Sequence, residues 1–374
     1  MMMVRSWWVV LLAPAAVLLA CRETASPLTV LDKPVQVLGR TFQQVGNVIE
    51  LRDGRVALAE LKDRTFLFIN FATGEATPVG VHADTIKKDD PAPGMHKLPG
   101  YVLRFAGDTV GLVDFAAERT SLWNEQGQFL RLVSGGKVGG TNQALAWDWS
   151  GHAYKEDLRT VLGGLEPGAE LGFDSLAVMR ITEGDTVADT VARMKLPVWG
   201  RGQFGETVKI VSTIFSGRDV FGVLPDGSLW AARANDNRVD WRSPTGEWTR
   251  GEKRHFVVIP VSQEEKDAFL EKLRVQMMQM GAPAGIELSY PFADTKPPFS
   301  SATATPTGEV WLQRSRAFAD SLPVWDVIGR NGKAIRTVQL PRGASVGGFG
   351  PEGRVYLILR DSEGRQTVAK YVVK

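Results

Sequence analysis

A glycine turn followed by a short apolar run recurs six times along the chain. In one copy Pro225-Asp226-Gly227 leads into Ser228-Leu229-Trp230, and in another Pro351-Glu352-Gly353 leads into Arg354-Val355-Tyr356. A glycine tolerates the positive φ of a tight hairpin turn, and the residues after it favour a strand. The six glycines are Gly54, Gly107, Gly151, Gly227, Gly308 and Gly353. Turns and short strands at this spacing are typical of an all-β protein.

A second glycine follows three of these turns after 19 or 20 residues. The pairs are Gly54 with Gly74, Gly107 with Gly127, and Gly227 with Gly246. Two glycine turns with a polar turn between them divide a repeat into four antiparallel strands. Because such a unit cannot bury both of its faces alone, six units are expected to stack radially around an axis. The sequence therefore predicts an all-β fold, a six-bladed β-propeller, with a seven-bladed propeller and a β-sandwich as alternatives.

The last predicted blade has room for only three strands, as far as Val373. We expect its missing outer strand to come from residues 28–39, which would pair with the C-terminal strand and close the ring. Pro34 is acceptable there because an outer strand has one unpaired edge. The predicted blades lie near residues 45–80, 100–135, 143–196, 219–260, 299–341 and 344–373.

Several of these segments resemble a known repeat family. Leu229-Trp230-Ala231-Ala232-Arg233 and the residues after it, as far as Ser243-Pro244-Thr245-Gly246-Glu247, resemble the NHL-type repeat. Pro297-Pro298-Phe299, Val310-Trp311, Trp325-Asp326-Val327 and Leu340-Pro341 are similar to segments of exported six-bladed propeller proteins of soil bacteria. The resemblance covers most of residues 40–374. It implies a propeller fold and an exported location, and that group has no established common activity.

The beginning of the chain predicts its destination. Residues 1–20 contain one cation, Arg5, followed by an uncharged stretch from Ser6 to Ala20 that is too short for a permanent membrane span. Leu18-Leu19-Ala20-Cys21 resembles the lipobox of bacterial lipoproteins, which implies acylation of Cys21. We therefore predict a signal peptide over 1–20, a lipid-anchored tether over 21–27, and a propeller over 28–374. An ordinary signal peptide, with Cys21 as a bystander, is the alternative.

The expected location is the cell envelope. Because Arg22 rather than Asp follows the cysteine, analogy with Gram-negative sorting suggests the outer membrane, in its periplasmic leaflet or at the cell surface. A tether over 21–27 spans at most about 25 Å. If the closing strand begins at the face of the first hairpin turns and runs toward the opposite face, the tether leaves from the first of these faces. That face is then expected to lie against the membrane.

Composition excludes some partners and chemistries. The 374 residues include 44 Lys and Arg against 42 Asp and Glu, a net charge of +2, and no basic run stands out. A nucleic acid is therefore not expected as a partner. The single cysteine excludes a disulfide within the chain and a CxxC metal site.

Insertions are expected to gather on one face of the propeller. The long segments 81–99, 155–172, 197–217 and 261–299 all fall in loops of the same side, which favours that side as the binding face, although they could merely cap the channel. A helical insertion is predicted over 262–281. Its helix runs from Gln263 to about Met280, with a Ser262 and Glu265 capping box and Gly281 as the stop. The stripe Phe269, Leu273, Met277 and Met280 should pack this helix onto the propeller.

Candidate ligand-binding residues lie in the long loops on this side of the propeller, which we call the upper loops. Exposed aromatic side chains there would suit recognition of a peptide or a glycan. The GxGxxG match over 200–205 lacks a βαβ context and is expected to be a flexible loop. Trp147 and Trp149 alternate along an inner strand and are expected to pack against the blades on either side. The ligand-binding candidates are Trp199, Arg201, Phe204, Tyr290 and His96.

No catalytic residue, metal ligand or cofactor is assigned from the sequence. The polar residues expected on inner strands are Asn47, Glu50, Arg104, Asp148 and Asp219, which include too few carboxylates for a metal cage. His82 and His96 could meet in one loop without further ligands, and Asn235-Asp236-Asn237 is expected to be a plain turn. The sequence thus predicts a lipid-anchored binding or scaffold module for a protein, peptide or glycan of the envelope. A metal-dependent, lactonase-like hydrolase or lyase with its site in the channel is the alternative.

Overall fold

The computed structural model describes residues 27–87, 90–134, 144–159, 174–183, 187–283 and 285–373. The expectation of a mostly β chain is confirmed, and α2 (Gln263–Gln279) is the one helix that lies wholly within these ranges. No helix in the described ranges is both long and apolar enough to cross a membrane. The predicted signal peptide (1–20) and the lipidation site Cys21 lie outside the described residues.

Six sheets, each with four antiparallel strands, follow one another along the described part of the chain, and we number them 1 to 6; sheet 5 has a fifth, parallel strand at its edge. Sheet 1 consists of β3 (Val45–Glu50), β4 (Val56–Glu60), β5 (Thr65–Ile69) and β6 (Ala76–Pro78). Sheet 2 consists of β9 (Pro99–Phe105), β10 (Thr109–Asp114), β11 (Arg119–Trp123) and β12 (Phe129–Val133). Sheet 3 consists of β13 (Ala146–Trp147), β14 (His152–Glu156), β15 (Ser175–Thr182) and β16 (Asp189–Lys195).

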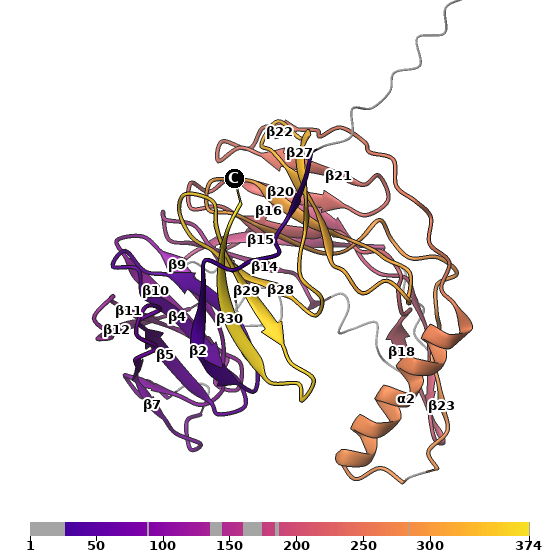
Figure 1. Ribbon diagram of the computed structural model, residues 1–374, viewed down its shortest axis with the longest axis horizontal. Helices are drawn as coiled ribbons and strands as arrows, with labels where there is room; N and C mark the ends of the chain where they lie inside the picture. Colours follow the sequence, from indigo (N-terminus) through magenta and orange to yellow (C-terminus); the bar gives the residue numbers. More distant parts are fainter. Residues whose placement is uncertain are drawn as a thin grey trace, which may run out of the picture.

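The second half of the chain repeats the arrangement (Figure 1). Sheet 4 consists of β19 (Val220–Val223), β20 (Leu229–Arg233), β21 (Arg238–Arg242) and β22 (Trp248–Thr249). Sheet 5 consists of β24 (Phe299–Ala304), β25 (Val310–Arg314), β26 (Val324–Ile328) and β27 (Ala334–Gln339). Sheet 6 consists of β28 (Ser345–Phe349), β29 (Arg354–Arg360), β30 (Gln366–Val372) and an N-terminal strand, β2 (Gln36–Phe42). β7 (Val81–His82) and β8 (Met95–His96) form a small parallel pair.

The repeated glycines occupy the turns that the sequence predicts. Each of the six glycines that precede a second strand has a positive φ, from 66° at Gly107 to 95° at Gly308. A residue with a Cβ is strained in this region, whereas glycine is not. The turn chemistry therefore sets the end of one edge strand in each sheet. We call these the innermost strands: β3, β9, β13, β19, β24 and β28.

The N-terminal segment differs from the expected single strand over 28–39. β1 (Leu28–Val30) pairs in parallel with β27 of sheet 5, and only β2 pairs antiparallel with β30 of sheet 6. The chain crosses from one sheet to the other around Leu31, which is buried between them. Pro34 lies in this crossing, outside both strands, so its missing N–H costs no ladder hydrogen bond.

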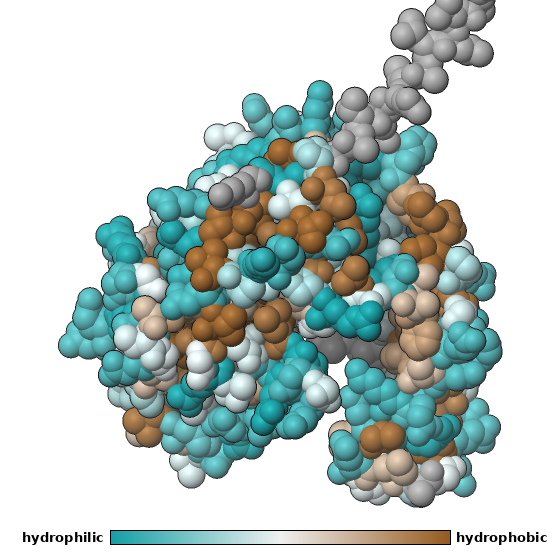
Figure 2. Space-filling view, viewed as in Figure 1, coloured by the Kyte–Doolittle hydropathy of each residue, from teal (hydrophilic) through white to brown (hydrophobic). Residues whose placement is uncertain are grey.

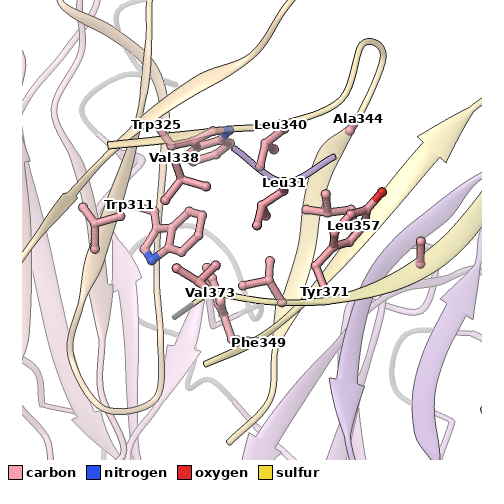
Figure 3. Packing of buried hydrophobic residues seen from close by; sticks show 13 residues of the cluster. Leu31, Trp311, Trp325, Val338, Leu340, Ala344, Phe349, Leu357, Tyr371 and Val373 are labelled. Atoms are coloured by element: carbon pink, nitrogen blue, oxygen red, sulfur yellow. The ribbon is translucent and has the colours of Figure 1, made fainter. Parts of the chain in front are cut away.

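A separate buried apolar cluster joins each sheet to the next, including sheet 6 to sheet 1. Strand alternation produces this pattern: on β4, Leu58 belongs to the cluster with sheet 6, whereas Ala57 and Ala59 belong to the cluster with sheet 2. Between sheets 5 and 6, Leu31 lies among side chains of both sheets, with Trp311 on one side (Figure 3). The core is therefore a series of layers between sheets rather than one central mass.

Two insertions assemble into one lobe. β17 (Trp199–Phe204) and β18 (Thr207–Ser212) come from the connection between sheets 3 and 4, while α2 and β23 (Leu288–Ser289) come from the connection between sheets 4 and 5. β23 pairs with β17, which makes a three-stranded sheet. This lobe lies beside the six sheets, at the lower right of Figure 1.

The lobe corrects two expectations about its sequence. The GxGxxG segment is strand β17 of a hairpin rather than a flexible loop, because β-branched residues of β18 pair with it. The helix has the predicted bounds, and the Glu265 N–H donates to Ser262 Oγ at 3.2 Å. Its apolar stripe, however, is only half-buried, Met280 is 79% exposed, and α2 contacts β23 of the lobe.

Candidate functional site

All six sheets contribute residues to one cavity of about 960 Å³, which we call the funnel. Its wall is built mainly from the turns that follow the innermost strands, so the repeated glycine turns place its side chains. The lobe connections join the opposite ends of these strands, since Gly217 and Arg218 precede β19 while Pro225 and Asp226 follow it. The funnel residues used below are Glu50, Arg52, Arg104, Phe105, Asp108, Trp149, Asp226, Glu309, Trp311, Arg330, Arg336, Phe349, Glu352 and Arg354.

The charged groups of the funnel are arranged in pairs. Arg52 Nε lies 2.5 Å from Asp108 Oδ1, and Arg330 Nη1 lies 2.9 Å from Asp226 Oδ2. Arg354 Nε donates to the buried Glu50 at 3.0 Å.

Two further contacts complete this set. Arg336 Nη2 lies 3.7 Å from Glu309 Oε1, and Arg354 Nη1 lies 2.9 Å from Glu352 Oε2. Arg104 donates to the backbone carbonyl of Glu50. The funnel therefore combines five arginines with five carboxylates, and its charge is close to neutral.

Burial and pairing shift the pKa values of two funnel residues, Asp226 and Arg354. Burial raises the pKa of Asp226, but hydrogen bonds from Ser228 and Arg330 outweigh it and hold the pKa below the usual value. For Arg354, burial lowers the pKa of the guanidinium, but the hydrogen bond to Glu50, together with the charges of Glu50 and Glu352, raises it above the usual value. Both groups are therefore ionised at neutral pH, Asp226 in its pair with Arg330 and Arg354 in its pair with Glu50.

Aromatic side chains line the funnel between the charged pairs. Trp149 is 52% exposed and lies in the turn after β13, so the expectation that it packs between blades is wrong. The strand ends at Trp147, which is buried and packs on Phe105 with ring centroids 5.4 Å apart. Strand alternation no longer applies after that point, and the turn directs the next indole outward. Trp311 and Phe349 are buried and complete the apolar lining.

Asp148 holds the turn that presents Trp149. Its carboxylate accepts from His152 Nδ1 at 2.8 Å and from Tyr154 Oη at 2.9 Å. The backbone N–H of Ser150 also donates to it, at 2.9 Å. Burial, then the nearby charge of Asp148, raises the pKa of Tyr154 well above its usual range, so its hydroxyl stays a donor. Asp148 thus serves the shape of the turn.

The five ligand-binding candidates are not brought together. Trp199, Arg201 and Phe204 lie on β17, and Phe204 packs edge-on against Tyr290 at a centroid distance of 5.3 Å. Phe269 of α2 lies 5.7 Å from Tyr290, so two of the predicted aromatics form the packing of the lobe. Arg201 is exposed, and Trp199 is half-buried.

His96 lies apart from these residues, in strand β8. It is 3% exposed, its Nε2 lies 3.2 Å from the carbonyl oxygen of Arg64, and its ring lies 6.3 Å from that of His82. Burial lowers the pKa of His96. In the described part of the chain, no group of three or more His, Cys, Asp or Glu side chains is placed to hold a metal ion.

The remaining residues discussed from the sequence have structural contacts. Asn47 Nδ2 donates to the carbonyl oxygen of Val102 at 2.8 Å, which links sheets 1 and 2. Asp219 pairs with Arg233 at 2.9 Å. The segment 235–237 forms the predicted turn, and Asn237 adopts a φ of 47° there.

A second cavity, of about 760 Å³, lies where the lobe meets sheet 5. Lys296 Nζ donates to Glu265 Oε1 at 2.6 Å and to the carbonyl oxygen of Arg316 at 2.7 Å. Both partners of this ion pair are about nine-tenths buried. Because a buried charge that loses its partner is costly, the pair fixes the first turn of α2 to the body.

Comparison with known proteins identifies no sequence relative. No family model matches the sequence, and no curated protein matches it. Solved structures that match the chain include a DUF4221 family member from Bacteroides vulgatus (9% identity, 90% of this chain and 95% of that chain, TM-score 0.46).

Two further matches are a gluconolactonase from Xanthomonas campestris and regucalcin, a calcium-binding protein from Agrobacterium tumefaciens. The gluconolactonase has 11% identity, covers 90% of this chain and 91% of its own, and has a TM-score of 0.40. Regucalcin has 11% identity, covers 92% and 95%, and has a TM-score of 0.36. The structural neighbours are propeller-type proteins.

Proposed function

We propose that the six sheets are the blades of a β-propeller whose ring is closed by β2, and that the funnel is the mouth of its central channel. The apolar clusters between successive sheets support this arrangement, since they include one between sheet 6 and sheet 1. A β-sandwich would instead bury one layer between two sheets. A seven-bladed ring would need another four-stranded sheet.

We further propose that the protein is a lipoprotein of the cell envelope, anchored through Cys21 and sorted to the outer membrane. The lipobox-like sequence supports this proposal. A thioether-linked diacylglycerol and an N-acyl chain together anchor a protein stably, whereas one chain alone is marginal. Metabolic labelling with palmitate tests it: the native chain should incorporate label and Cys21→Ser should not. Equal labelling of both chains would contradict the anchor.

The proposed activity is binding of a peptide or glycan in the funnel. The observation that carries it is the convergence of six sheets on a cavity that combines a half-exposed Trp149 with prearranged arginine and carboxylate pairs. Indole faces and guanidinium planes provide stacking surfaces, and the paired charges provide donors and acceptors for amide or hydroxyl groups. A near-neutral wall does not select a polyanion such as nucleic acid.

Peptide and glycan arrays probed with the purified protein test this activity. Trp149→Ala is expected to weaken the retained ligand by about 2 kcal/mol, roughly 30-fold in Kd, as for other aromatic anchors. Trp248→Ala is the matched control, because Trp248 is 43% exposed on sheet 4 and does not line the funnel. Unchanged binding by the Trp149 variant would place the ligand elsewhere.

A metal-dependent hydrolase or lyase remains the alternative function. Its metal would have to draw carboxylates away from the arginines that hold them, beginning with Glu50 and Arg354. Elemental analysis of the purified protein, with and without chelator, separates the two proposals. A stoichiometric calcium or zinc ion that resists dilution would favour the alternative.

A further inference from the structure

The chain enters the body of the protein from the side. The carbonyl oxygen of Pro27 accepts from the N–H of Thr337, which lies past the middle of β27, the outermost of the four antiparallel strands of sheet 5. The funnel lies at one end of the innermost strands, and the lobe connections lie at the other. Pro27 therefore lies between the two ends of the channel, and β1, parallel to β27, runs away from the funnel.

Apolar side chains are exposed along the same edge. Leu28 and Val30 on β1 are 59% and 50% exposed, and Val35 and Val37 are 66% and 48% exposed. Residues two apart on an extended strand point to one side, so each pair projects outward together. We call these four residues the apolar rim. Figure 2 shows hydrophobic side chains on the face where the N-terminal strands of Figure 1 run.

A membrane anchored through Cys21 would lie close to this edge. Resting on the proposed acylation of Cys21, residues 21–27 can place the bilayer surface at most about 25 Å from Pro27. Lys33 and Arg40 are exposed in the same segment beside one exposed carboxylate, Asp32, and the net positive charge favours an anionic lipid surface. Apolar residues flanked by cations are typical of segments that lie in a membrane interface.

We infer that the apolar rim is a membrane-contact surface, occupied by the lipid bilayer to which Cys21 is anchored. The propeller then rests on the outer edges of sheets 5 and 6, with its channel axis along the membrane plane. In that orientation the funnel and the lobe both open to the aqueous phase. A ligand can reach the funnel without passing between the protein and the lipid.

Site-specific fluorescence quenching tests this surface. The acylated protein is reconstituted into phosphatidylethanolamine and phosphatidylglycerol vesicles that contain brominated lipid. Single cysteines are introduced as Val35→Cys or Val37→Cys and labelled with bimane, since native Cys21 is blocked by its acylation. Val208→Cys is the matched control, a valine 60% exposed on β18 of the lobe.

The rim labels should lose about half of their fluorescence, because interfacial apolar side chains enter about 5–10 Å into the headgroup and acyl boundary. The label at residue 208 should keep its fluorescence. Vesicle-bound protein whose rim labels are no more quenched than the control would overturn the contact surface and leave the anchor intact. Protein that does not float with the vesicles would overturn the anchor and this orientation together. Rim labels shielded only in a lipid-free dimer, detected by sedimentation, would assign the rim to a second copy.

Discussion

Replacing Trp311 by alanine should destabilise the packing between sheets 5 and 6, and with it the fold. Its indole is 1% exposed in the cluster between sheets 5 and 6, with ring centroids 6.3 Å from Trp325 and 5.2 Å from Phe349. A buried tryptophan truncated to alanine typically costs about 3–5 kcal/mol, through lost burial and the cavity left behind. Since globular proteins are stable by about 5–15 kcal/mol, this loss is a large fraction of the total.

Urea unfolding followed by far-UV circular dichroism measures that loss. Trp248→Ala is the control and should cost less than about 1 kcal/mol, because its side chain is 43% exposed on the outer strand of sheet 4. Trp311→Phe should lie between the two, since it keeps an aromatic ring and removes an N–H that has no hydrogen-bond partner among the described residues. Equal losses of unfolding free energy for Trp311→Ala and Trp248→Ala would refute the argument that the cluster between sheets 5 and 6 stabilises the fold.

Three further changes test buried polar groups. Asp148→Ala should cost about 3 kcal/mol in urea unfolding, because it leaves the buried Tyr154 hydroxyl without its acceptor; a loss below 1 kcal/mol would contradict this. Glu265→Ala should speed hydrogen exchange in α2 by about 100-fold, because it leaves the buried Lys296 charge without its carboxylate partner. The double variant Glu265→Leu, Lys296→Met removes both charges and should restore protection. Burial lowers the pKa of Lys155 to about 8, below the value of an unfolded lysine, so the unfolded chain binds the extra proton above pH 8. The unfolding free energy of the native protein, relative to Lys155→Met, should therefore rise between pH 8 and 10, and a constant difference would exclude this titration.

The sheets could be anticipated from the sequence because turn chemistry is local. Each of the six repeated glycines adopts a positive φ in the turn after an innermost strand, and the residues on either side need no distant partner to be recognised as strands. The cap of α2 is local in the same way, because Ser262 Oγ accepts a hydrogen bond from the N–H of Glu265, three residues later. Such features depend on neighbours within a few residues, so one sequence is enough to find them.

The candidate site could not be anticipated in the same way. The pairing of Phe204 with Leu288 joins residues from different insertions, and nothing in either segment alone specifies it. Trp149 departs from the expected position between blades because β13 ends at Trp147, so strand alternation does not extend to it. The funnel itself needs side chains from all six sheets, so its composition emerges only from the arrangement of the turns.

The packing of the lobe favours the funnel over the loops as the proposed recognition surface. The aromatic side chains of the lobe pack against one another, as Phe204 and Phe269 do on either side of Tyr290, and are not presented together to a ligand. Replacing residues 263–279 by a short glycine and serine linker should therefore expose this packing and lower the thermal stability of the lobe. The funnel walls come from the other ends of the sheets, so the variant should still retain the array ligand within about twofold in Kd, less than 0.5 kcal/mol. Loss of binding on deletion of α2, with Trp149→Ala without effect, would return the ligand to the lobe.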